Sequence, residues 1–226
     1  MKIICVVTAR KNSKSIKNKN LVKINNLRLI EYTFRAIKKS KLKDKAYILT
    51  DSKKIKKLSK KYKINSDYNR PKNLSLDKTS TIKTLQHFSK WYLKNNNYDA
   101  LILLQPTSPL RTQVDINQSI EIFKKNKMDS LFSISESLEH PYETINLKNS
   151  DKILFNLKKS QKYFRRQDFD INSYFINGAI YILKKKLVLK SKMYNTKKHC
   201  FYTMPKSRSF DVNDSEDISI IKKLLK

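Results

Sequence analysis

The sequence predicts an α/β fold of the doubly wound type, in which helices cover both faces of a mainly parallel sheet. Short apolar runs bounded by polar residues recur along the chain, and such runs are typical of buried strands. Between them, apolar side chains return at every third or fourth residue, as in amphipathic helices. Strands that alternate with helices form βαβ units, whose strands lie parallel to one another.

The first predicted strand covers residues 3–7, the apolar run Ile-Ile-Cys-Val-Val. A helix is expected next, over residues 30–37, because the apolar side chains there fall on one face. Residues 46–50, Ala-Tyr-Ile-Leu-Thr, form the second predicted strand. The order of strand, helix and strand is that of a first βαβ unit.

The middle of the chain continues this alternation. Helical spacing returns over residues 55–62, and either Asp51 or Ser52 can cap the amino terminus of that helix. A further helix is expected over residues 82–92. Residues 100–104, Ala-Leu-Ile-Leu-Leu, form an unbroken apolar run and the clearest buried strand.

The second half of the chain predicts a helix over residues 116–123 and a strand over residues 131–135. From residue 137 to residue 172 the pattern breaks down into a polar, lysine-rich stretch, which predicts an arm or an insertion. A strand is expected again at residues 174–183, followed by a closing helix over residues 218–225.

The 226 residues are enough for one sizeable domain, and we expect a single domain over residues 1–226. Cys5 and Cys200 lack the paired spacing of a zinc site and the density of a disulfide framework. The apolar runs are far shorter than the roughly 20 residues of a membrane span. Thr8 and Arg10 interrupt the first run before it could form a signal peptide. A cytoplasmic protein without a membrane partner is expected.

The formal net charge of +31 leaves two interpretations open. A strongly basic chain can bind a polyanion such as nucleic acid. However, the lysines are spread over the whole chain, asparagine and isoleucine are also abundant, and only one glycine occurs. This skew also fits a general drift in which exposed positions have filled with lysine. The rarer residues, including the eight arginines and Gly178, are therefore the informative ones.

Two loops are expected to carry the chemistry, because ligands of doubly wound sheets bind at the carboxyl ends of the strands. The loop over residues 8–20 follows the first strand and is rich in lysine and asparagine. The loop over residues 104–111, Leu-Gln-Pro-Thr-Ser-Pro-Leu-Arg, follows the predicted strand at residues 100–104. Its two prolines either form a stiff connection only or hold an amide, hydroxyls and Arg111 in place for a ligand.

Six segments together form an ordered set of motifs. They are residues 9–16 with Lys19 and Asn20; Arg70 and Pro71 with Leu74, Asp77, Thr79 and His87; residues 104–111; residues 165–167; residues 177–181; and residues 211–213. In this order they resemble the acylneuraminate cytidylyltransferases, the CMP-sialic acid synthetases, a family that includes legionaminate and pseudaminate cytidylyltransferases. The resemblance covers nearly the whole chain, and it implies a Rossmann-like nucleotidyltransferase sheet.

The resemblance implies that the first loop wraps the triphosphate of CTP, using backbone N–H groups and fixed cations. Asn12 and Ser15 stand where the family usually has glycine, and asparagine tolerates a left-handed backbone. Thr79 and Ser80 either contact the nucleotide or cap the helix that follows. The resemblance assigns nucleotide binding to Arg10, Ser13, Lys14, Lys19, Asn20, Arg70, Asp77, Thr79 and Ser80.

The resemblance also implies a pocket for a sugar acid. A glycine within a strand marks close approach of a ligand or of another backbone, which draws attention to Gly178. Tyr181 either lines this pocket or is a core aromatic. The residues assigned to the sugar are Gln105, Arg111, Arg166, Gln167, Asn177, Gly178 and Tyr181. Residues 137–172 would form a dimerisation arm, through which Arg166 could bind the sugar carboxylate in the neighbouring subunit.

The implied reaction transfers CMP from CTP to the anomeric hydroxyl of a nine-carbon ulosonic acid and releases pyrophosphate, for surface polysaccharide biosynthesis. Arg10, Lys14 and Lys19 would position the phosphates and neutralise their charge, together with Mg²⁺. Asp211 is the expected metal ligand, and Asn213 stands where the family has a second aspartate.

Other interpretations of these residues stay open. Asp211 and Asp214 could merely cap the closing helix. The nearer rival function is a cytidylyltransferase for KDO, the eight-carbon acid of lipopolysaccharide, and the more distant one is a basic nucleic-acid-binding protein. The motifs do not select among sialic, legionaminic and pseudaminic acids, and they assign no general base.

Overall fold

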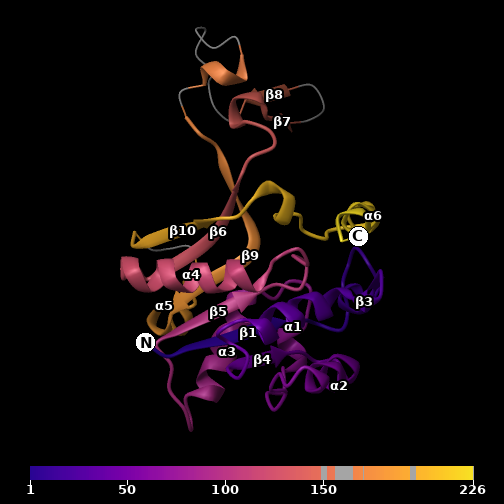
Figure 1. The fold of residues 1–226 in the computed structure, drawn as a ribbon, viewed down its shortest axis with the longest axis vertical. Coiled ribbons are helices and arrows are strands. Elements are labelled where there is room, and N and C mark those ends of the chain that lie inside the picture. The colour runs from indigo at the N-terminus through magenta and orange to yellow at the C-terminus, as the bar shows by residue number, and fades with distance from the viewer. Residues whose placement is uncertain (149–151, 156–164, 170, 194–196, 226) are drawn as a thin grey trace.

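The apolar runs of the sequence form the strands of a central sheet in the computed structural model, which describes all residues except 149–151, 156–164, 170, 194–196 and 226. The described sheet has six strands in the order β10-β6-β9-β5-β1-β4 (Figure 1). The strands are β1 (Ile3–Thr8), β4 (Ala46–Leu49), β5 (Ala100–Leu104), β6 (Ser130–Glu136), β9 (Tyr174–Lys184) and β10 (His199–Thr203).

The sheet is mainly parallel, as the sequence predicted. β1 pairs in parallel with both β4 and β5, and β10 pairs in parallel with β6. β9 is the exception, because it runs antiparallel to both of its neighbours, β5 and β6. The pairing of β6 with β9 shifts register between Phe132 and Ile134, so the two strands are irregular where they leave the main body.

Helices cover both faces of the sheet, which confirms the doubly wound prediction. Successive residues of β1 point to opposite faces, so Cys5 joins one hydrophobic cluster and Val6 joins the other. The first cluster includes side chains of α1 (Leu29–Lys39), α2 (Lys53–Lys61) and α4 (Gln113–Asn126). The second includes side chains of α3 (Thr81–Tyr92) and α5 (Lys185–Leu189).

Side-chain hydrogen bonds cap the amino termini of α2 and α4. The Ser52 hydroxyl accepts a hydrogen bond from the Ile55 N–H at the start of α2, so Ser52 rather than Asp51 is the cap. At the start of α4, the side chains of Thr112 and Asp115 form a reciprocal capping box. This second cap lies directly after the proline-containing turn, and it therefore sets the direction in which that turn enters the helix.

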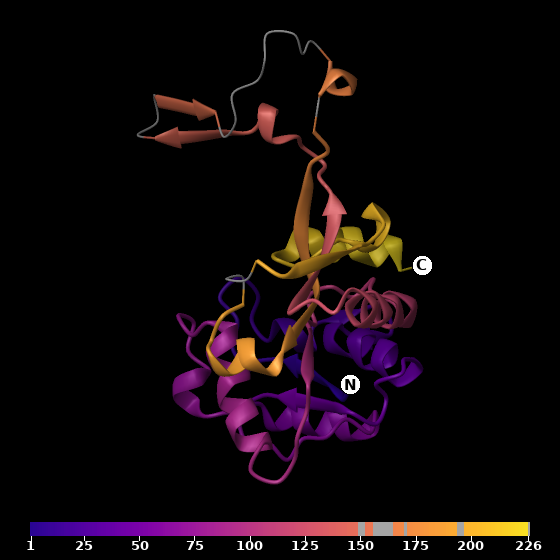
Figure 2. The same ribbon diagram turned by 90° about the vertical axis from the view of Figure 1, so that its left-hand side faces the viewer.

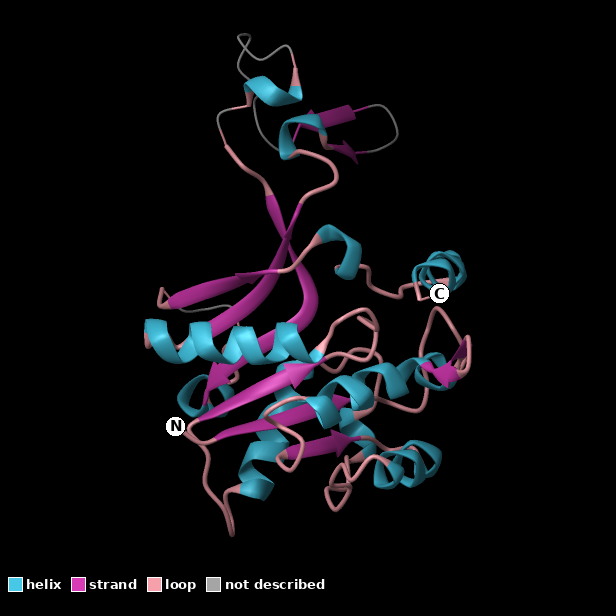
Figure 3. Cartoon of the chain, in the orientation of Figure 1, coloured by secondary structure: helices cyan, strands magenta, loops and turns pink. Residues whose placement is uncertain are grey.

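Shorter elements complete the described chain, and Figure 3 distinguishes helices, strands and loops. They are the strands β2 (Lys23–Ile24) and β3 (Leu27–Arg28) and the 3-10 helices η1 (Lys19–Leu21), η2 (Lys72–Leu74), η3 (Pro141–Glu143), η4 (Arg166–Asp168) and η5 (Lys206–Arg208). The closing helix α6 (Ser215–Leu224) packs its Ile218 and Ile221 against Ile24 and Leu29.

The predicted arm projects from the main body (Figures 1 and 2). β6 and β9 lead out to it, and its described part contains the antiparallel hairpin of β7 (Ile145–Lys148) and β8 (Lys152–Phe155). His140 is buried near its base, where its Nε2 lies 3.1 Å from the Ile171 carbonyl oxygen. Among the described helices, none has the length and apolar character required to cross a lipid bilayer.

Candidate active site

A cavity of about 270 Å³ lies where the loops after β1 and β5 meet. This is the carboxyl edge of the sheet, where the sequence predicted the chemistry. The lining residues are Thr8, Arg10, Ser13, Lys19, Asn20, Arg70, Leu76, Asp77, Thr79, Thr81, Thr84, Gln105, Pro106 and Thr107. The cavity thus brings three cations together with hydroxyl and amide groups from segments far apart in the sequence.

The arginines of the cavity are held in place by neighbouring groups. Arg10 forms an ion pair with Asp77, and the Asn20 side-chain amide donates a hydrogen bond to the Arg10 carbonyl oxygen. The Arg70 guanidinium donates through Nε and Nη2 to the Leu74 carbonyl oxygen, at 3.1 and 2.6 Å. Burial lowers the pKa of Arg70. Because these two hydrogen bonds go to a neutral carbonyl oxygen, the positive charge of this half-buried guanidinium can still attract an anionic ligand.

Lys19 links the first loop to the carboxyl-terminal part of the chain. Its Nζ donates to the carbonyl oxygens of Val212 and Asn213, at 2.9 and 3.0 Å. The Ser15 hydroxyl donates to the same Asn213 oxygen, at 2.5 Å. Burial lowers the pKa of Lys19, and the nearby Asp211 carboxylate opposes this effect. The ammonium group is therefore directed toward residues 211–213 as well as toward the cavity.

Asp211 lies at this junction, and its own carboxylate is partly buried. Ser108 Oγ donates to its Oδ1 at 3.2 Å. Burial raises the pKa of Asp211, whereas hydrogen bonds from Thr107 and Ser108 and the charge of Lys19 act in the opposite direction. Such a carboxylate fits a Mg²⁺ ion that takes most of its remaining ligands from substrate phosphates and water. Among the described residues, no group of three His, Cys, Asp or Glu side chains could hold a metal by itself.

The alternative that the acidic residues cap the closing helix holds for Asp214 only. Its carboxylate accepts hydrogen bonds from the N–H groups of Glu216 and Asp217 at the start of α6. The side chain of Asn213 is exposed, and its backbone N–H donates to the Asp217 carboxylate. Asp211 takes no part in this cap, so its carboxylate faces Ser108 and Lys19 instead.

Two residues predicted to bind nucleotide are not among those that line the cavity. Lys14 is exposed on the first loop, and Ser80 is exposed at the amino-terminal cap position of α3, where its side chain accepts no capping hydrogen bond. Thr79 does line the cavity, and its hydroxyl donates to the Asn73 carbonyl oxygen. The motifs did not single out Thr81 and Thr84, although their three-residue spacing on α3 places both hydroxyl-bearing side chains at the cavity.

Gln105 and Gly178 lie close together at the sugar side of the predicted site. Gly178 has a φ of +75°, a conformation that favours glycine, and a Cβ added there would lie 3.3 Å from Gln105 Oε1. The single glycine therefore leaves room for the Gln105 side chain. Tyr181 is 5% exposed and packs in the core cluster that contains Phe132, while its hydroxyl oxygen lies 3.9 Å from the position of a Cβ added at Gly178.

The structure places Arg111 beneath the site rather than in it. The residue is 2% exposed, and its Nη1 donates to the carbonyl oxygens of Gln105 and Ala179 at 3.0 and 2.7 Å. Its Nη2 donates to Thr33 Oγ1 at 2.6 Å. With these partners the guanidinium supports the turn that carries Gln105.

Asn177 is likewise buried, and both ends of its side-chain amide form hydrogen bonds within the protein. Its Oδ1 accepts from Ser133 Oγ and from the Ala179 N–H, and its Nδ2 donates to Ser209 Oγ. It therefore holds the backbone on either side of Gly178. Gln167 lies apart from the first cavity and lines a second one of about 320 Å³ at the base of the arm. Arg166 begins η4, and its side chain lies outside the described part of the chain.

A set of cations at the carboxyl edge of a doubly wound sheet is typical of nucleotide-binding α/β proteins. Residues 4–216 match the family model described as Cytidylyltransferase, and the chain belongs to this family of nucleotidyltransferases.

Known relatives span nearly all of the chain. The "Post-translational flagellin modification protein B" of Campylobacter coli is 32% identical over 227 aligned positions, which cover 99% of this chain and 95% of that protein. An N-acylneuraminate cytidylyltransferase of Streptococcus agalactiae serotype V is 31% identical over 219 positions, covering 96% of this chain and 52% of that longer protein.

A solved structure has the same fold. It is a CMP:2-keto-3-deoxy-manno-octonic acid synthetase complexed with CTP, which superposes with a TM-score of 0.73 at 12% identity. The match covers 100% of this chain and 98% of that one. At this identity the similarity supports the fold alone.

Proposed function

We propose that this cytidylyltransferase joins CMP from CTP to the anomeric hydroxyl of a nine-carbon ulosonic acid, of the sialic, legionaminic or pseudaminic type, and releases pyrophosphate. The observation that carries the proposal is the cavity of the carboxyl edge, which Arg10, Lys19 and Arg70 line together with Gln105. The relative named as an N-acylneuraminate cytidylyltransferase supports the choice of sugar acid.

The protein contributes mainly position and charge to this reaction. Arg10 can hold phosphate oxygens with two parallel hydrogen bonds, and Lys19 adds a second positive charge. Asp211 would hold the Mg²⁺ ion, with the neutral amide of Asn213 as a second candidate ligand. When bound, Mg²⁺ neutralises charge on the phosphates and on the leaving pyrophosphate. Gln105 would orient the acid by hydrogen bonds from its amide.

The substrate class is tested by measuring pyrophosphate release with CTP and a panel of ulosonic acids, with a reaction that lacks any acid as the control. We expect release only in the presence of an acid, and the highest kcat/KM with a nine-carbon acid. A preference for the eight-carbon acid would contradict the sugar assignment while leaving the family assignment intact.

Gly178→Ala is expected to raise the KM for the sugar acid about 10-fold, because the new methyl group displaces Gln105. The left-handed backbone adds a strain of about 1–2 kcal/mol, which thermal unfolding would show. The control is Gln105→Ala alone and combined with Gly178→Ala. If the two changes act through the same amide, the double variant should be little worse than either single one. Full additivity would show that Gly178 does not act through Gln105.

We further propose that the arm joins two copies of the chain. Several large apolar side chains on the arm and its base are exposed, and clusters of this kind usually mark contact surfaces. They are Ile145, Ile171, Tyr174, Phe175 and Ile176. A second copy of the chain would cover them and bring Arg166 of one subunit near the sugar site of the other. The free thiols Cys5 and Cys200 fit a cytoplasmic location for such a dimer.

Subunit mixing tests the shared site. The Arg10→Ala protein and the Arg166→Ala protein should each have low activity. A mixture that has exchanged subunits should regain part of the activity, because some sites then contain an intact Arg10 from one subunit and an intact Arg166 from the other. The measurement is pyrophosphate release before and after exchange, with exchange followed by a fluorescence label. If the subunits exchange but activity does not recover, either Arg166 acts on the site of its own chain or it does not contribute to the site.

A further inference from the structure

Residues 205–213, here called the strap, connect β10 to the acidic residues of the site. The strap begins at Pro205, includes the 3-10 helix η5 and ends at Asn213. Its far end carries Asp211 and the two carbonyl oxygens that accept hydrogen bonds from Lys19. The position of the strap therefore decides where the proposed metal ligand lies.

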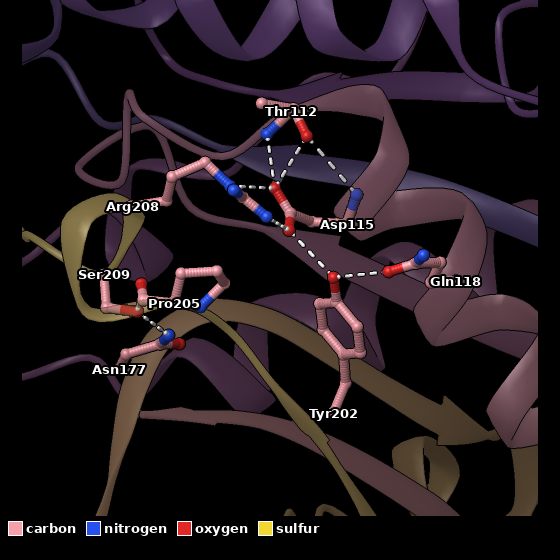
Figure 4. Close-up of polar contacts among 8 residues, drawn as sticks. All are labelled: Thr112, Asp115, Gln118, Asn177, Tyr202, Pro205, Arg208 and Ser209. Carbon is pink, nitrogen blue, oxygen red and sulfur yellow. Dashed lines mark hydrogen bonds and ion pairs between the residues drawn. The ribbon is translucent and has the colours of Figure 1, made fainter. Parts of the chain in front are cut away.

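One buried carboxylate anchors the near end of the strap (Figure 4). Asp115 is fully buried and accepts from Arg208 through Nε at 3.2 Å and Nη2 at 2.7 Å. It also accepts from the Thr112 N–H, from the Thr112 hydroxyl and from the Tyr202 hydroxyl, each at 2.8 Å. These donors outweigh the effect of burial and lower the pKa of Asp115.

The anchor joins the strap to the turn of the active site. Asp115 is the third residue of α4, which begins directly after the turn that carries Gln105 and Ser108. The two-pronged contact with Arg208 fixes both the distance and the direction of η5 relative to that turn. Nothing in the proposed reaction uses Arg208 or Asp115 directly.

Further contacts carry this geometry along the strap. Asn177 Nδ2 donates to Ser209 Oγ at 3.0 Å, which ties the middle of the strap to β9 (Figure 4). The Val212 N–H donates to the Thr107 carbonyl oxygen at 2.8 Å. Asp211 lies between these two points, three residues after Arg208. Its carboxylate is thus held from both sides.

We propose that Arg208 is a positioning residue of this enzyme, which acts through Asp115 to hold the strap so that the Asp211 carboxylate meets the phosphate end of the nucleotide cavity. The inference rests on the proposed function, because only there is Asp211 a metal ligand. Residues that hold a metal ligand in place typically change metal affinity by about 10- to 100-fold when they are replaced.

The test compares Arg208→Gln and Arg208→Lys with a matched control, Lys206→Gln. Lys206 lies in the same 3-10 helix and pairs with Glu136 on the surface, where both side chains are exposed. Its loss removes the same charge without touching Asp115. Three quantities are measured on folded protein: Mn²⁺ binding in the presence of CTP by electron paramagnetic resonance, CTP binding in EDTA, and hydrogen exchange of the Val212 amide.

We expect Arg208→Gln to weaken Mn²⁺ binding about 10-fold or more and to speed exchange at Val212, with metal-free CTP binding within about twofold of the wild type. Arg208→Lys keeps the positive charge but loses the two parallel hydrogen bonds to Asp115, so its Mn²⁺ affinity and its exchange rate at Val212 should lie between those of the wild type and Arg208→Gln. If Arg208→Gln does not fold, Arg208→Lys is compared with Lys206→Gln in its place. Lys206→Gln should match the wild type.

The proposal is wrong if Arg208→Gln matches Lys206→Gln in both Mn²⁺ binding and Val212 exchange. Asp211→Ala separates this failure from a failure of the proposed function. If Asp211→Ala binds Mn²⁺ as tightly as the wild type, Asp211 is not a metal ligand. The proposed effect of Arg208 on the metal is then wrong as well. If Asp211→Ala loses Mn²⁺ while Arg208→Gln keeps it, the metal assignment stands and only the role of Arg208 is refuted.

Discussion

Asp211→Ala is expected to lower kcat at least about 1000-fold at saturating CTP and sugar acid. The Asp211 carboxylate accepts a hydrogen bond from Ser108 and lies near Lys19, which lines the cavity. A Mg²⁺ ion without a protein carboxylate would be held by the phosphates alone and would lose its fixed position relative to the sugar. The loss should be measured as steady-state pyrophosphate release over a Mg²⁺ titration.

Two neighbouring substitutions are the controls for this result. Asn213→Asp, which adds a charge beside Asp211, should lower the Mg²⁺ concentration required for half-maximal rate. Asp214→Asn removes a charge from the helix cap, so it should cost stability of about 1 kcal/mol or less and leave the Mg²⁺ requirement unchanged. A near-normal rate and unchanged Mg²⁺ requirement in Asp211→Ala would contradict the metal role.

Arg10→Ala should raise the KM for CTP about 100-fold. Hydrogen bonds between a charged group and its partner contribute about 1.5–3 kcal/mol each, and Arg10 can make two of them to a phosphate. Its removal also leaves the Asp77 carboxylate unpaired at the cavity wall, where it would repel the triphosphate. Initial rates over a range of CTP concentrations measure the effect.

The neighbouring lysine provides the matched control for Arg10. Lys11 is exposed and does not line the cavity, so Lys11→Ala removes one positive charge from the same loop without removing a phosphate contact. We expect its KM for CTP to stay within about twofold of the wild type. Arg10→Lys should have a KM for CTP between those of Arg10→Ala and the wild type, since lysine keeps the positive charge but cannot form two parallel hydrogen bonds to a phosphate. Equal effects of Arg10→Ala and Lys11→Ala would show that only overall charge matters.

Much of the fold could be predicted because buried parallel strands are continuous apolar runs. β5 has all of its residues buried and was the clearest prediction. β10 was missed because only Tyr202 among its five residues is buried, as befits a strand at the sheet edge. The antiparallel direction of β9 could not be predicted either, since its direction depends on where the chain returns after the arm and not on its own residues.

The candidate site was predicted best where a loop directly follows a strand. Arg10 and Gln105 both line the cavity because the strands before them end at the same edge of the sheet. Arg111 could not be placed from the sequence, because its partners include the Ala179 carbonyl oxygen, far away along the chain. The contact of Arg208 with Asp115 was missed for the same reason: no local pattern connects two residues 93 positions apart.

Mass spectrometry of the product tests the central claim most directly. The purified protein is incubated with Mg²⁺, a nine-carbon ulosonic acid and either CTP or UTP, and pyrophosphate is measured in the same samples. We predict one CMP-linked sugar acid for each pyrophosphate released, with CTP strongly preferred over UTP. Equal rates with the two nucleotides, or pyrophosphate release without a CMP-linked sugar acid, would contradict the proposed function.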